Sequence, residues 1–170
     1  GILATRHISG QFAEEIGLKG LKSVSVITPG VLGQTGIETA ELIKGAISAV
    51  RPDVLIVIDA LTAGSAERLF RTIQLCNTGI SPGSWVKNSR QEISEKNLDI
   101  PVIAVGVPTV TDADTLALEL TGKEPEKESN MFVTPKDVDL LVDRISEILA
   151  QALNLFLQPE IDGDIISRLV

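Results

Sequence analysis

The chain has 170 residues, of which 44% are apolar and 22% are charged, so its composition is that of a folded globular protein and excludes a disordered one. A chain of this length buries roughly 70% of the surface that it exposes when unfolded, so it can form a core without metals or disulfides. With only four Phe and one Trp, that core must be built from Val, Ile, Leu and Ala.

Charge and cysteine content exclude several classes of function. The net charge is −8, which predicts no direct binding to nucleic acid, because most of the surface would repel phosphate groups. A single cysteine, Cys76, and a single histidine, His7, cannot form an internal disulfide or a Cys/His metal cluster. We therefore expect no metal, no cofactor and a reducing cytoplasmic location.

No apolar stretch approaches the roughly 20 residues that a membrane-spanning helix needs, so we expect no membrane segment and no export signal. The chain begins at Gly1 without an initiator methionine, which indicates a fragment or a processed form.

The first third of the chain predicts a strand, a loop and a helix. Residues 23–28 are rich in β-branched residues and are followed by Pro29, which is typical of a strand. Thr35 and Glu38 have the spacing of a capping box at the start of a helix, and the apolar residues that follow have helical periodicity up to Val50.

The middle of the chain predicts further strands around a long loop. Residues 54–58 are continuously apolar, which predicts a strand buried on both faces, and Asp59 is expected to end it. Residues 65–71 predict a short helix, and residues 72–76 alternate like a half-buried or edge strand. Residues 77–90 are rich in Gly, Pro, Ser and Asn and predict a functional or mobile loop.

The last part predicts one more strand and two helices. Residues 101–107 form a second continuous apolar strand, and Thr111 is the expected cap of a helix that ends near Leu120. Thr134 is the expected cap of a long amphipathic helix that continues to about Leu157.

Buried strands that alternate with amphipathic helices predict an α/β fold with a mainly parallel or mixed central sheet and helices on both faces. We find no internal repeat and no domain boundary, so we expect a single domain over residues 1–170.

In open sheets of this class the functional site lies beyond the carboxyl ends of the strands. Thr28, Asp59, Thr109 and Asp112 follow or end the predicted strands, so we expect them to converge. Asp59 comes directly after five apolar residues, and partial burial is expected to raise its pKa unless a hydrogen-bond donor compensates. The alternative is that Asp59 only caps the next turn.

Other residues suggest chemistry less specifically. Gly30, Gly33 and Gly36 precede a helix, but they do not match a known phosphate-binding motif, so we interpret them as a loop that needs permissive backbone angles. No nucleophile motif surrounds the serines at 65, 81 and 84, and we interpret Cys76 as a small core residue. His7 could lie at the surface or pack inside, and Trp85 could contact a ligand or anchor its own loop.

Several strings of the chain resemble, in the same order, blocks of the spore germination protease family of endospore-forming bacteria. The strings are Thr5-Arg6-His7, residues 28–39 (TPGVLGQTGIET), Pro52-Asp53, Ile58-Asp59-Ala60-Leu61, Thr72-Ile73-Gln74, Thr78-Gly79-Ile80, Pro82-Gly83-Ser84, residues 100–110 (IPVIAVGVPTV) with Asp112, Val133-Thr134-Pro135-Lys136 and Val138-Asp139. The likeness covers most of the chain.

The resemblance implies an endopeptidase that begins the degradation of small acid-soluble spore proteins during germination. It also implies a zymogen, a homo-oligomer (a tetramer), a location in the spore core, and a three-layer α/β sandwich of phosphorylase/hydrolase-like type, related to the hydrogenase maturation proteases. Catalysis in the family is attributed to two aspartates, of which Asp59 matches one. The side chains and loops expected to line the site are Thr28, Gly30, Gly33, Glu38, Thr109 and Asp112.

The second aspartate of the family lies upstream of the Thr-Arg-His string, in a segment that this sequence does not contain. We therefore expect the chain to lack an N-terminal segment and to be inactive alone unless another carboxylate, such as Asp112 or Glu38, replaces it. The family also has a histidine where Ser81 stands, and a long insertion before Val133. Two alternatives stay open: a small-molecule or phosphate-binding α/β module, and a catalytically inactive subunit or fragment.

Overall fold

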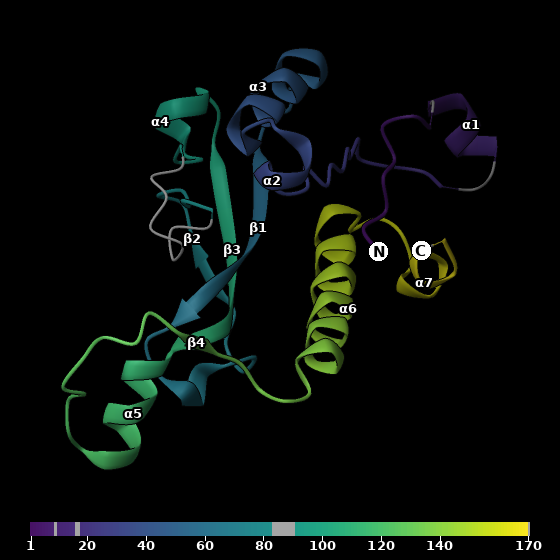
Figure 1. Ribbon diagram of the computed structural model, residues 1–170. Coiled ribbons are helices and arrows are strands. Elements are labelled where there is room, and N and C mark those ends of the chain that lie inside the picture. The colour runs from purple at the N-terminus through teal and green to yellow at the C-terminus, as the bar shows by residue number, and fades with distance from the viewer. Residues whose placement is uncertain (9, 16–17, 83–90, 170) are drawn as a thin grey trace. The chain divides into compact units, whose positions relative to one another are not determined.

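The computed structural model describes residues 1–8, 10–15, 18–82 and 91–169 (Figure 1). The chain divides into two compact units. One consists of Gly1–Thr28 together with Leu140–Val170, and the other of Pro29–Asp139.

The unit Pro29–Asp139 is built on a mixed open sheet. Its strands are β1 (Leu55–Ala63), β2 (Gln74–Cys76), β3 (Val102–Asp112) and β4 (Phe132–Val133). The order is β1-β3-β2, with β1 parallel to β3 and both β2 and β4 antiparallel to it. In Figure 1, α3 lies toward the amino ends of β1 and β3, and α5 lies near their carboxyl ends. The predicted α/β class with a mixed sheet is therefore confirmed.

Both long strands continue further than their apolar runs. The prediction that Asp59 ends its strand is wrong, because β1 continues through it to Ala63. Asp59 pairs with Gly106 in register, since a carboxylate side chain leaves the backbone donor and acceptor of the ladder intact. The prediction of burial on both faces is also too strong, because Ile58 is 46% exposed.

Helix α3 (Thr39–Val50) supplies apolar side chains to the core beside the sheet. Its Ile43 is buried together with Ile93, Leu98 and Val102, each of which contributes about 1.5–3 kcal/mol by burial. The helix ends as predicted, just before Pro52.

The start of α3 differs from the prediction. The helix begins after Glu38, whose side chain makes no capping hydrogen bond, and Thr35 belongs instead to a short helix, α2 (Leu32–Thr35). The Thr35 hydroxyl is engaged locally, since it accepts from the Ile37 amide at 3.2 Å. The predicted capping box is therefore wrong, because the Thr35 hydroxyl bonds to the backbone of Ile37 and Glu38 makes no capping hydrogen bond.

Helix α5 (Ala113–Thr121) is capped by Asp112 and not by Thr111. The Thr111 side chain is buried and donates a hydrogen bond to the Ala63 carbonyl at 3.0 Å, so it joins the two strands instead. Along the chain, the single-turn 3-10 helix η1 (Ala66–Arg68) lies between β1 and β2, where a short helix was predicted. Helix α4 (Glu95–Leu98) lies between β2 and β3.

The long predicted helix is α6 (Val138–Leu157), and it starts later than expected. Thr134 does not cap it, because the Thr134 hydroxyl donates to the Thr109 carbonyl at 2.8 Å. The chain also forms α1 (Gly10–Glu15) and α7 (Gly163–Leu169). None of the helices among the described residues is long and apolar enough to span a lipid bilayer.

The segment 23–28 is not a strand in the structure. The Val24 carbonyl accepts hydrogen bonds from the amides of Thr5 and Arg6, at 2.9 and 3.0 Å, and no neighbouring strand is paired with it among the described residues. A strand needs a partner for its backbone groups, so the β-branched composition alone was not enough.

Two buried amide side chains at the end of α6 hold extended segments of the same unit. Asn154 accepts from the Leu3 amide at 2.8 Å and donates to the Gly1 carbonyl at 3.0 Å. Gln158 accepts from the Lys22 amide and donates to the Lys22 carbonyl, both at 2.8 Å. Each side chain therefore satisfies one backbone donor and one backbone acceptor, as a neighbouring strand would.

Candidate functional site

Asp59 lies in a row of three residues across the sheet. It is the register partner of Gly106 on β3, and Gly106 is in turn the partner of Gln74 on β2. Register partners point to the same face, so Asp59 and Gln74 stand on one face with a glycine between them. Strands are about 4.8 Å apart, which places the two backbones about 10 Å from each other.

Leu61 fills the space that the glycine leaves in this row. A Cβ atom added to Gly106 would overlap the Leu61 side chain, so this leucine lies directly over the Gly106 backbone. Leu61 is two residues beyond Asp59 on β1 and therefore shares its face. The carboxylate and the carboxamide are thus separated by an apolar group.

Asp59 is half-buried at the border of the core. Val57, two residues earlier on the same face, packs against the buried cluster beneath α3. The Ala60 amide donates to the Asp59 carboxylate at 2.9 Å. This contact is the local turn-like bond that the alternative interpretation of Asp59 predicted, but it occurs within a strand. The expected rise in pKa stays a prediction.

Thr109 and Asp112 lie further along β3. Thr109 is the extra residue of a bulge, since Leu61 pairs with Pro108 and Thr62 pairs with Val110. Asp112 is six residues beyond the partner of Asp59, or about 20 Å along an extended strand. Its carboxylate accepts from the Asp114 amide at 2.8 Å, as a helix cap does. Asp112 and Asp59 therefore do not converge.

The glycine-rich segment has the predicted permissive backbone angles at Gly30 and Gly36, but the prediction of a loop is wrong at Gly33, which is helical. Gly30 and Gly36 have φ angles of 72° and 69°, a region that favours glycine. Gly33 lies inside α2, and Glu38 is half-buried at the start of α3. Thr28 is exposed at the end of the other unit's N-terminal segment.

The remaining residues that the sequence singled out are mostly exposed where the structure describes them. Cys76 is exposed on the short strand β2, so its interpretation as a core residue is wrong. A three-residue edge strand has too little cover to bury it. His7 and Ser81 are exposed as well. Trp85 and Ser84 lie outside the described residues.

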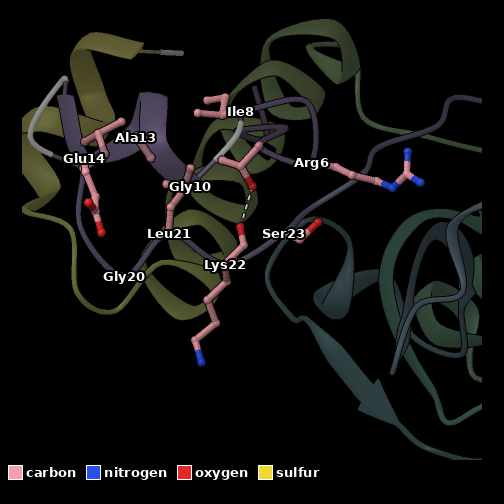
Figure 2. Close-up of a pocket in the computed structure, with 11 residues that line it drawn as sticks. Arg6, Ile8, Gly10, Ala13, Glu14, Gly20, Leu21, Lys22 and Ser23 are labelled. Carbon is pink, nitrogen blue, oxygen red and sulfur yellow. Dashed lines mark hydrogen bonds between the residues drawn. The ribbon is translucent and has the colours of Figure 1, made fainter.

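A cavity of about 200 Å³ lies in the unit that contains the N-terminus (Figure 2). Its apolar part includes Ile8, Ala13 and Leu21, which belong to or pack against that unit's small core. In Figure 2 the charged ends of Arg6 and Lys22 lead away from these side chains. The cavity contains none of the predicted site residues.

In the part of the chain that the structure describes, no group of three or more His, Cys, Asp or Glu side chains could hold a metal ion. The residues that the sequence missed are Gln74, Gly106 and Leu61. All three were within recognised strings, but only the strand register shows that they surround Asp59.

The fold and the site define an α/β protein with a half-buried carboxylate on the face of a mixed sheet. The sequence profile of the germination protease family matches residues 1–121. This chain belongs to the germination protease family.

Curated relatives agree over nearly the whole chain. The germination protease of Clostridium tetani is 42% identical over 195 aligned positions, which cover 95% of this chain and 60% of the relative. The germination protease of Caldanaerobacter subterraneus subsp. tengcongensis is 44% identical, and the alignment covers 93% of this chain and 59% of the relative. The germination protease of Clostridium acetobutylicum is 37% identical, and the alignment covers 99% of this chain and 62% of the relative. The chain thus spans about three fifths of the length of these relatives.

The alignment with the Clostridium tetani protein has more positions than this chain has residues. That relative therefore carries residues within the aligned region that are missing here. This agrees with the expectation of an insertion in the family, although the alignment length does not place it before Val133.

Proposed function

We propose that this chain is the part of a spore germination endopeptidase that contributes Asp59 as one catalytic carboxylate. The observation that carries the proposal is the membership of residues 1–121 in the germination protease family, together with the half-buried position of Asp59. The other predicted site residues, Thr28, Gly30, Gly33, Glu38, Thr109 and Asp112, remain predictions as site-lining groups.

The chemistry needs a base and an acid. Asp59, in its ionised form, takes a proton from a water molecule while the water oxygen adds to the carbonyl carbon of the peptide bond. The carbon–nitrogen bond then breaks, and the leaving nitrogen must receive a proton from a protonated acid. We propose that this second carboxylate comes from coding sequence upstream of Gly1, as the family resemblance implies.

The proposed substrates are small acid-soluble spore proteins, and the proposed location is the spore core. On the resemblance we also propose a homo-oligomer, a tetramer, whose mass light scattering would measure. The phosphate-binding alternative has less support, because Gly33 lies inside a helix of four residues and not in a loop before a helix N-terminus.

The proposal predicts that Asp59→Asn abolishes cleavage of a purified small acid-soluble spore protein. The amide has nearly the same shape but cannot accept the proton, so kcat should fall by at least about 100-fold. Cleavage is followed by gel electrophoresis, with the protein expressed from its own coding region, upstream sequence included.

Asp53→Asn is the matched control, because Asp53 is exposed just before β1 and should retain full activity. Full activity of Asp59→Asn would overturn the proposal. Full activity of residues 1–170 alone would overturn the requirement for an upstream carboxylate, but not the role of Asp59.

A further inference from the structure

The row Asp59–Gly106–Gln74 contains two polar side chains that approach the same space from different strands. Gln74 is exposed, so the two donors and the acceptor of its carboxamide are accessible to a ligand. Asp59 enters from β1 on the other side of β3. Leu61 fills the space over Gly106, so a group that lies on the Leu61 side chain would have a carboxylate on one side and a carboxamide on the other.

The row lies at the end of the pairing between β2 and β3. Gln74 is the first residue of β2, and the last register pair between β2 and β3 is Gln74 with Gly106. Beyond this row, toward the carboxyl end of β3, the Phe70 amide donates to the Pro108 carbonyl at 2.9 Å, so the segment before β2 still runs beside the strand. A ligand would therefore reach the row from the face of the sheet, where Gln74 is exposed and Asp59 is half-buried.

Leu61 determines the character of the surface between the two polar groups. Its methyl groups lie against the Gly106 backbone, and the leucine itself is half-buried, so the surface between the two polar groups is apolar. Next to an apolar surface, water is partly excluded, and hydrogen bonds are electrostatically stronger than in bulk water. A neutral carboxamide suits this place, because a lysine there would pair with Asp59 and oppose its role as a base.

We propose that Gln74 is a substrate-binding residue whose carboxamide donates a hydrogen bond to the carbonyl oxygen of the peptide bond under attack. This inference rests on the proposed function of Asp59. Negative charge develops on that oxygen when water adds to the carbonyl carbon, so an N–H donor placed at that oxygen stabilises the transition state more than the ground state.

The test measures kcat and KM separately for spore-protein cleavage, with the protein expressed from its full coding region. Gln74→Ala removes the carboxamide, and Gln74→Glu keeps its shape but removes the donors. Both should lower kcat by about 100-fold with little change in KM, since loss of one such donor costs about 10²–10³ in kcat. The kcat of Gln74→Asn should lie between the kcat of these two variants and that of the wild type.

Gln151→Ala is the control, because Gln151 is an exposed glutamine on α6. Unchanged melting temperatures are expected for all four variants, since both glutamines are exposed. The inference is overturned if Asp59→Asn is inactive while Gln74→Ala and Gln74→Glu keep kcat within twofold, or if only KM rises. If Asp59→Asn still cleaves, the proposed function itself fails, and the role of Gln74 falls with it.

Discussion

At the scale of single residues, the contact between Leu61 and Gly106 is the tightest constraint in the candidate site. Glycine is normally a weak choice in a strand interior, because it has no side chain to pack. Here the missing side chain is what allows Leu61 to lie against the backbone of the neighbouring strand. Gly106 is therefore required by the packing of Leu61 and not by an unusual backbone angle.

Gly106→Ala should lower the free energy of unfolding by about 1–3 kcal/mol, because the added methyl group overpacks the site. The cost should be much smaller in a Leu61→Ala background, where the space is free. Urea unfolding of the wild type, both single variants and the double variant gives the coupling energy. Effects that add within about 0.5 kcal/mol would show that the two residues do not compete for the same space.

At the scale of secondary-structure elements, Asp112 connects the end of β3 to the start of α5. Its carboxylate accepts from the Asp114 amide, one of the amides that a helix start leaves without an intrahelical partner. Asp112→Ala should therefore lower the free energy of unfolding by about 1 kcal/mol, whereas Asp112→Ser should retain most of the stability. Thermal or urea unfolding measures both changes.

Glu126→Ala is the control for this cap, because Glu126 is exposed in the segment before β4, and its effect should stay within about 0.5 kcal/mol. Equal stability of Asp112→Ala and the wild type would contradict the capping role.

Much of the fold was predictable from apolar periodicity, and the errors have identifiable causes. The cores of β1, β3, α3 and α6 were predicted because long apolar runs are strong signals. The predicted helix starts were less accurate. Thr35, Thr111 and Thr134 are all typical capping residues, but each hydroxyl makes another hydrogen bond instead of the predicted cap. A threonine hydroxyl can bond locally or across strands, and the sequence does not distinguish these uses.

The candidate site was predictable only in part. Asp59 was found because a charge directly after five apolar residues is conspicuous, and a carboxylate at the border of a core often has a functional reason. Gln74 was not found, since its relation to Asp59 depends on an antiparallel pairing between segments more than ten residues apart. Strand order and register arise from tertiary packing, which local patterns do not contain.

At the scale of the whole molecule, the net charge of −8 limits its partners. A chain with this excess of acidic groups should not bind duplex DNA at physiological salt, because it would gain little from counterion release. Fluorescence anisotropy with a labelled duplex should show no binding up to about 100 µM protein, weaker than the usual nonspecific range. Binding that weakens steeply with added salt would contradict this prediction.

The amides of Asn154 and Gln158 recognise the backbone of Gly1, Leu3 and Lys22 and none of their side chains. During evolutionary divergence, the residue types at positions 3 and 22 can therefore drift without loss of these contacts. The two amides are themselves buried, and a substitution at either position would remove the hydrogen bonds that hold these backbone groups. Both lie beyond residues 1–121, the part that matches the family profile, so the carboxyl-terminal region constrains the amino-terminal segment in a way that comparison of the amino-terminal sequences alone would not reveal.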